Sequence, residues 1–212
     1  MSTDASVEER ALVAILRGIT PEQAVAVGTT LYEAGIRALE VPLNSPSPFA
    51  SIAALVTSNL PGSLIGAGTV LTTEDVERTV EAGGRLIVAP NCDLDVIRHA
   101  LRSSMQVMPG IATATEAFTA IRAGASSLKL FPAITYGPAH LKALKAVLPE
   151  KVRVFPVGGI GAPDIKAWLA AGAAGFGFGS ELYQPEYTLK EIAHRARTLV
   201  SALREARQPL TG

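Results

Sequence analysis

The sequence has no excess charge of either sign and almost no cysteine. Its 212 residues include 19 Lys and Arg against 19 Asp and Glu. This balance gives no electrostatic reason to expect binding to nucleic acid or to an anionic membrane, so small molecules are the expected ligands. The single cysteine, Cys92, cannot form an internal disulfide and is interpreted as a structural thiol, consistent with a reducing compartment.

Long hydrophobic runs are also absent. Gly, Pro or a charged residue interrupts every apolar run well before the ~20 residues that cross a bilayer. The first ten residues, MSTDASVEER, lack the basic start and apolar segment of a secretory signal, which favours a cytoplasmic location. With 48% hydrophobic residues, we expect one domain over residues 1–212, with short flexible ends at about 1–10 and 207–212.

What the sequence does contain is a repeated alternation of short apolar runs and longer helical segments. The first helix has a clear start, with Thr20 as the capping residue and Pro21 at the first helical position. The eight predicted strands are 12–17, 37–43, 63–70, 85–90, 105–110, 127–133, 152–159 and 174–180. The pattern predicts an α/β fold, a (β/α)₈ TIM barrel. A doubly wound sheet is the alternative, but no GxGxxG opens the first helix.

Four polar residues lie in or just after predicted strands. Lys129 interrupts the apolar run SSLKLFPA, and Glu40 interrupts RALEVPL, although burial of a charge is costly without a partner or a task. By strand parity we expect Arg17 to face inward with Val13 and Ile15, and Thr69 with Ile65 and Ala67. A buried structural ion pair is the competing interpretation of Lys129 and Glu40.

Glycines follow the last two predicted strands. Gly158 and Gly159 come after the seventh strand and precede the helix start Ala162-Pro163-Asp164, whereas Gly179 and Ser180 come after the eighth. Backbone N–H groups at such positions can approach an anion closely, and barrels of this kind commonly hold phosphate there. The sequence therefore predicts a phosphate site in these two loops.

A metal site is not expected. His99, His140 and His194 lie in three different predicted helices without the carboxylate or cysteine spacing of metal ligands. Trp168 lies on an apolar helical face and is interpreted as core.

Nine motifs in order resemble the bacterial 2-keto-3-deoxy-6-phosphogluconate aldolase family over roughly Ala11 to Ala206. They are AILRGITPEQA, LEVPLNSP, IGAGTVL, IVAPN, MPGIATATEAFTA, LKLFPA, GPAHLKALKAVLP, VFPVGGI and FGSELY. The resemblance implies a class I aldolase on a (β/α)₈ barrel, a homotrimer in the cytoplasm, with no metal or organic cofactor.

The resemblance also implies residue roles. Lys129 would form the Schiff base and Glu40 would act as acid and base. The remaining implied roles are substrate contacts: Arg17 and Thr69 at the keto acid, Gly158, Gly159, Gly179 and Ser180 at the phosphate, and Val157, Phe131 and Asn44 along the sugar chain, with Phe131 at the floor of the site.

The galactonate branch of the family fits best, because Asn44 and Val157 stand where the gluconate branch usually has arginine and threonine. This branch implies cleavage of 2-dehydro-3-deoxy-6-phosphogalactonate to pyruvate and D-glyceraldehyde 3-phosphate. The C4-epimeric 2-keto-3-deoxy-6-phosphogluconate is the alternative substrate, since C4 discrimination involves small energy differences. A phosphate-binding barrel isomerase or epimerase is an alternative reaction class, and a non-catalytic sugar-phosphate binder is a third.

Overall fold

The computed structural model describes residues 10–208, in which parallel strands alternate with helices. The strands are β1 (Leu12–Ile15), β2 (Ala38–Pro42), β3 (Leu64–Gly68), β4 (Leu86–Val88), β5 (Gln106–Met108), β6 (Gly110–Ile111), β7 (Ser127–Leu130), β8 (Arg153–Pro156) and β9 (Phe176–Phe178). The helices are α2 (Pro21–Glu33), α3 (Pro48–Thr57), α4 (Thr73–Glu81), α5 (Leu94–Arg102), α6 (Ala114–Arg122), α7 (Ala133–Lys145), the 3₁₀ turn η1 (Ala162–Asp164), α8 (Ile165–Ala170) and α9 (Leu189–Arg207). Each predicted strand region contains a strand, shorter than predicted.

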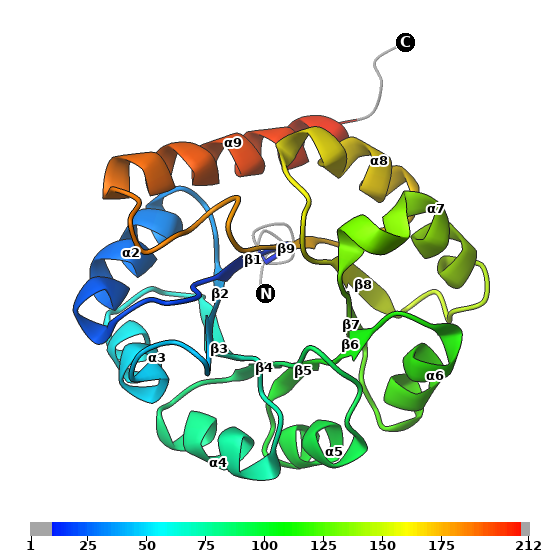
Figure 1. Ribbon diagram of the computed structural model, residues 1–212, viewed down its shortest axis with the longest axis horizontal. Helices are drawn as coiled ribbons and strands as arrows, with labels where there is room; N and C mark the ends of the chain where they lie inside the picture. Colours follow the sequence, from blue (N-terminus) through cyan, green and yellow to red (C-terminus); the bar gives the residue numbers. More distant parts are fainter. Residues whose placement is uncertain (1–9, 209–212) are drawn as a thin grey trace, which may run out of the picture.

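The strands form two parallel sheets surrounded by helices. One sheet has the order β5-β4-β3-β2-β1-β9 and the other β6-β7-β8. Figure 1 shows the strands around the centre of the molecule and the helices as an outer ring. Within residues 10–208 the strand order follows the chain from β1 to β5, without the reversal that defines a doubly wound sheet. The alternative fold is therefore disfavoured.

Backbone contacts join the two sheets at both meeting points. Between β8 and β9, the Ala174 N–H donates to the Val154 carbonyl at 2.9 Å, and Val157 forms an isolated parallel bridge with Gly177. On the other side, β5 and β6 are separated only by Pro109, which has no N–H to donate to a strand ladder. The Pro109 carbonyl accepts from the Lys129 N–H at 2.9 Å, so the chain continues from one sheet to the other.

Each strand has an inner face and a face toward the helices. The inner, smaller cluster contains Val13, Ala38, Leu64, Leu86, Val88, Met108 and Phe155. The larger core packs strands against helices and includes Ile65, Ala67 and Trp168. The parity predicted within β2 is confirmed, and in β1 Val13 faces inward as predicted, while the facing of Arg17 beyond the strand stays a prediction. The parity predicted for β3 is wrong, because Ile65 and Ala67 face the helices while Leu64 faces inward.

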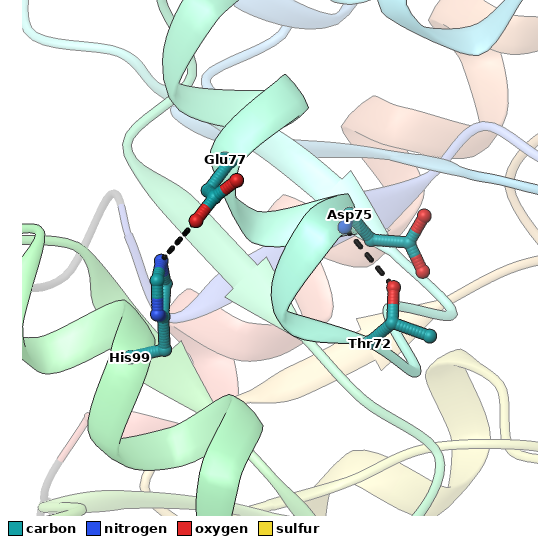
Figure 2. Close-up of polar contacts among 4 residues, drawn as sticks. All are labelled: Thr72, Asp75, Glu77 and His99. Carbon is teal, nitrogen blue, oxygen red and sulfur yellow. Dashed lines mark hydrogen bonds and ion pairs between the residues drawn. The ribbon is translucent and has the colours of Figure 1, made fainter.

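Several helix starts carry capping side chains. Thr20 and Gln23 form a capping box at α2, with Pro21 as its first residue. At α4 the Thr72 hydroxyl accepts from the Asp75 N–H at 3.1 Å (Figure 2). The same view shows Glu77 of α4 beside His99 of α5, with Oε1 and Nε2 3.4 Å apart, so these neighbouring helices also meet through polar side chains.

The flexible ends predicted for about 1–10 and 207–212 lie mostly outside the described residues, and Arg207 is the last residue of α9. Among the helices of residues 10–208, none has the length and apolar character needed to cross a bilayer.

Substitution of Thr113 tests how much the helix caps contribute. At α6 the Glu116 carboxylate accepts from the N–H groups of Ala112 and Thr113, each at 2.8 Å, and Thr113 Oγ1 accepts from the Glu116 N–H. Thr113→Ala should lower the free energy of unfolding by about 1 kcal/mol in urea titrations. Thr115→Ala, at an exposed position of the same helix, is the matched control and should change it by less than about 0.5 kcal/mol. Equal losses in the two variants would contradict the cap assignment.

Candidate active site

Two charged side chains, Glu40 and Lys129, are buried among the strands. Glu40 is the third residue of β2 and lies in register with Ile15 and Gly66. Lys129 is the third residue of β7 and lies in register with Gly110 and Phe155. Their exposed fractions are 1% and 6%, and no other charged side chain of the described residues is buried. The structure thus brings together the two residues that sequence patterning marked as unusual.

Burial changes the acidity of both groups. Loss of solvent raises the pKa of Glu40 to about 7, although the positive charges of Lys129 and Arg17 oppose this rise. Loss of solvent lowers the pKa of Lys129, the Glu40 carboxylate opposes that shift, and Arg17 adds to it. The three groups therefore share one electrostatic environment. Glu40 and Lys129 do not form a direct ion pair, so the interpretation as a closed structural salt bridge is not supported.

Arg17 lies two residues beyond the end of β1, at the carboxyl ends of the strands. Its Nη1 donates to Asn44 Oδ1 at 2.6 Å, and both side chains are exposed. A guanidinium in this place can bind a carboxylate with two parallel hydrogen bonds. Asn44 fixes one side of that guanidinium, which links two of the predicted substrate residues.

Thr69 directly follows β3 and is partly buried. Its φ is +57°, in the left-handed region that is uncommon for residues other than glycine. The strand parity stops at Gly68 because the backbone turns at Thr69. Strand parity therefore does not give the direction of the Thr69 side chain, and its role in binding the keto acid stays a prediction.

Two phenylalanines lie near Lys129, one after the end of β7 and one on the neighbouring strand β8. Phe131 lies beyond the end of β7, 39% exposed, with its ring centroid 4.9 Å from Lys129 Nζ. Phe155 is in register with Lys129 and belongs to the inner apolar cluster, 3% exposed. Phe131 therefore lies beside the Lys129 amine, after the end of the strand, and its predicted place at the floor of the site stays a prediction. Sequence reasoning did not single out Phe155, which packs on the inner face beside Lys129.

The two glycine loops lie side by side, because the bridge between Val157 and Gly177 joins the segments that precede them. Gly158 and Gly159 have φ of +98° and +71°, which only glycine adopts without strain. Among residues 10–208, the N–H groups of Gly159 and Ser180 donate to no protein acceptor. Free N–H groups in neighbouring loops are suited to bind an anion.

The helix start after the first of these loops is already occupied by a carboxylate. Asp164 Oδ2 accepts from the Gly161 N–H at 2.7 Å. The contribution of this helix end to an anion site is therefore smaller than the sequence suggested, and the free N–H groups are those of the two glycine loops.

Gly68 is a further residue that the sequence analysis missed. A Cβ at this position would lie 1.8 Å from Oε2 of Glu40, so the carboxyl group lies directly against its backbone. The signal in the sequence is the pair of glycines in GAG, at alternate positions of an apolar strand, where a side chain would otherwise be expected.

The histidines lie apart from this site. His99, His140 and His194 are in α5, α7 and α9, as predicted, and His140 Nε2 lies 2.6 Å from the Ala112 carbonyl oxygen. In the part of the chain that the structure describes, no three His, Cys, Asp or Glu side chains gather closely enough to hold a metal ion.

Comparison with known proteins identifies the family. Residues 3–196 match the model of the KDPG and KHG aldolases. The chain is 49% identical over 197 residues to the 2-dehydro-3-deoxy-6-phosphogalactonate aldolase of Escherichia coli K12, covering 93% of this chain and 96% of that protein. It is 47% identical to a probable enzyme of the same name from Rhizobium meliloti 1021, with 92% of each chain covered. The chain belongs to the KDPG and KHG aldolase family.

Solved structures agree with this assignment. A structure described as native KDPGal has a TM-score of 0.92 at 49% identity, covering 93% of this chain and 96% of that one. A protein cage designed by fusing symmetric oligomeric domains matches with a TM-score of 0.91 at 49% identity, covering 92% of this chain and 73% of the cage chain. A KDPG aldolase from Legionella pneumophila, with pyruvate captured as a covalent carbinolamine, matches with a TM-score of 0.80 at 27% identity, covering 97% and 99%.

The raised pKa of Glu40 predicts how stability depends on pH. Between its ordinary value of 4.5 and about 7, the folded protein keeps a proton that the unfolded chain has lost. Stability contributed by this group is therefore complete at low pH and is lost as pH rises through that window. Glu40→Gln cannot ionise and so does not lose stability in this window. The free energy of unfolding of the variant relative to wild type should therefore increase from pH 4 to pH 8 by on the order of 3 kcal/mol.

Chemical unfolding of both proteins at the two pH values measures this difference. Glu150→Gln, at an exposed position, is the control and should show no such gain. A Glu40→Gln gain that does not depend on pH would contradict the burial argument.

Proposed function

We propose that the protein is a class I aldolase that cleaves 2-dehydro-3-deoxy-6-phosphogalactonate to pyruvate and D-glyceraldehyde 3-phosphate. The observation that carries the proposal is the buried amine of Lys129 beside the buried carboxyl of Glu40 at the inner face of the strands. Family membership and the 49% identity to the Escherichia coli enzyme support the substrate.

Lys129 acts as the nucleophile. Because burial lowers its pKa, a larger fraction of its amine is neutral and can attack the C2 carbonyl of the keto acid. Loss of water from the carbinolamine then gives a protonated imine. Its positive nitrogen withdraws electrons and weakens the C3–C4 bond. A carbinolamine of pyruvate captured in the Legionella relative supports this route.

Glu40 transfers the protons that these steps require. Its pKa of about 7 allows it to exist as acid and as base near neutral pH, which is the range where one group can serve both roles. It accepts the C4 hydroxyl proton during cleavage, which releases D-glyceraldehyde 3-phosphate and leaves an enamine. Protonation at C3 and hydrolysis of the imine then release pyruvate and restore the Lys129 amine.

The remaining residues hold the substrate so that C2 lies beside Lys129. Arg17 binds the carboxylate with its planar guanidinium, supported by Asn44 and accompanied by Thr69. The loops of Gly158, Gly159, Gly179 and Ser180 bind the phosphate at the other end. Between these ends, Val157 and Phe131 contact the sugar chain. Anchoring at both ends removes most of the orientational freedom that would otherwise slow the reaction.

The architecture that supports this chemistry is a single-domain (β/α)₈ barrel. Counting β5 and β6 as one strand interrupted by Pro109 gives eight strand positions, and the contacts of β8 with β9 support closure. We propose a homotrimer in the cytoplasm, with sugar phosphate and keto acid as its partners. The matching cage built from symmetric oligomeric domains supports an oligomer.

Borohydride trapping tests the covalent step. Incubation with pyruvate and borohydride should add one reduced pyruvate to the protein, located on Lys129 by peptide mass spectrometry. Lys129→Ala should prevent this addition and reduce cleavage by several orders of magnitude. Lys151→Ala, at an exposed lysine, should retain both. Full cleavage activity without an adduct would overturn the imine mechanism, whereas absence of both the adduct and pyruvate release would support the isomerase or epimerase alternative.

Comparison of the two C4-epimeric substrates tests the substrate assignment. We expect kcat/KM for 2-dehydro-3-deoxy-6-phosphogalactonate to exceed that for the gluconate epimer, by roughly 10-fold or more, since differences of 1–3 kcal/mol are typical of such discrimination. Coupled assay of released pyruvate measures both. A preference for the gluconate epimer would assign the alternative substrate and leave the aldolase mechanism intact.

A further inference from the structure

The inner side of Gly68 is in contact with the carboxyl group of Glu40 on the adjacent strand. A Cβ built on Gly68 would lie 1.8 Å from Oε2, 2.2 Å from Cδ and 2.5 Å from Oε1. Non-bonded heavy atoms are in favourable contact near about 3.5 Å, so no side chain larger than hydrogen fits there. The carboxyl group thus occupies the volume that any other residue at position 68 would fill.

The backbone of Gly68 does not itself require glycine. Its φ lies outside the left-handed region, so an alanine could adopt the same conformation. Gly66, two residues earlier on the same face, differs in this respect. Its Cβ would lie 1.9 Å from the Leu86 carbonyl oxygen, so a neighbouring strand excludes a side chain there. At Gly68 the obstacle is one functional side chain.

The two oxygens of the Glu40 carboxyl group have different surroundings. Oε2, the atom nearest Gly68, is enclosed and has no hydrogen-bond partner among the described residues. Oε1 is not enclosed in this way and accepts no hydrogen bond from residues 10–208. Contact with Gly68 therefore leaves Oε1 as the oxygen available to a reacting group.

We propose that Gly68 is a positioning residue for the aldol cleavage, seating the Glu40 carboxyl group so that Oε1 exchanges protons with the substrate held on Lys129. This inference rests on the proposed function. It assigns Gly68 no contact with substrate and makes its effect depend entirely on Glu40. A side chain introduced at position 68 would have to displace the carboxyl group by more than about 1 Å to reach ordinary contact distance.

Kinetics of Gly68→Ala provide the first test. A displacement of about 1 Å typically costs ~10²-fold in rate, so kcat should fall by about that factor. KM should change less than about threefold, because Gly68 does not bind substrate. The acid limb of the pH–rate profile should move to lower pH, since the displaced carboxyl group regains contact with water. A variant with kcat within threefold of wild type would overturn the proposal.

A double-mutant cycle separates this effect from general damage to the fold. Glu40→Asp withdraws the carboxyl group by one methylene. Adding Gly68→Ala to Glu40→Asp should therefore cost less than about threefold in kcat, against about 100-fold when Glu40 is present. An equal cost in both backgrounds would show that position 68 acts independently of the carboxylate and would overturn the proposal.

Thermal unfolding tests the same contact if Gly68→Ala proves too unstable for kinetics. Gly68→Ala should lower Tm in wild type but not in the Glu40→Ala background, where the obstacle is gone. Gly66→Ala is the matched control and should lower Tm in both backgrounds, because its obstacle is backbone. A loss of Tm from Gly68→Ala that persists with Glu40→Ala would contradict the proposal.

Wild-type activity distinguishes failure of this inference from failure of the proposed function. If wild type does not cleave the sugar acid, the proposed function fails and the Tm cycle alone decides the contact. If wild type cleaves it and Gly68→Ala is fully active, only the positioning role fails.

Discussion

Removal of Glu40 and Lys129 from water is the constraint on which the rest of the site depends. Both side chains lie among the strands, where desolvation raises the pKa of the acid and lowers the pKa of the amine. The charge of each group opposes the pKa shift of the other, and the positive charge of Arg17 lowers the pKa of both. The result is an acid with a pKa of about 7 beside an amine with a lowered pKa, obtained at a cost in folding stability that an apolar pair would avoid. In the proposed function, the surrounding glycine loops and Arg17 hold a substrate against this pair.

The fold was largely predictable because its signals are local. Apolar runs punctuated by Gly and Pro marked every strand region, and Thr20 with Pro21 marked the first helix start. Strand ends were less predictable, since Arg17 and Phe131 continue the alternation of inward and outward positions in the sequence although the strands end at Ile15 and Leu130. The break at Pro109, which divides one predicted strand between two sheets, follows from its missing N–H but needed the structure to locate.

The site was predictable where an unusual residue type interrupts a strand and unpredictable where the information is spatial. Lys129 and Glu40 stood out as charges in apolar runs. The facing of β3 was assigned wrongly because glycines occupy its inner positions, so no large side chain marked that face. Gly68 was missed for the same reason, and Phe155 was missed because a buried phenylalanine in a strand looks like ordinary core. Only three-dimensional contact shows that one borders the Glu40 carboxyl group and the other lies beside Lys129.

The most direct test of this account is an NMR titration of the Lys129 side-chain nitrogen in the protein without substrate. Assignment follows from the signal missing in a Lys129→Met variant, and the exposed lysines in the same spectrum serve as internal references. The account predicts that the Lys129 midpoint lies well below those of the exposed lysines, because burial and Arg17 disfavour its charge. A midpoint at or above theirs would mean that the amine stays charged at neutral pH, and it would contradict the central claim.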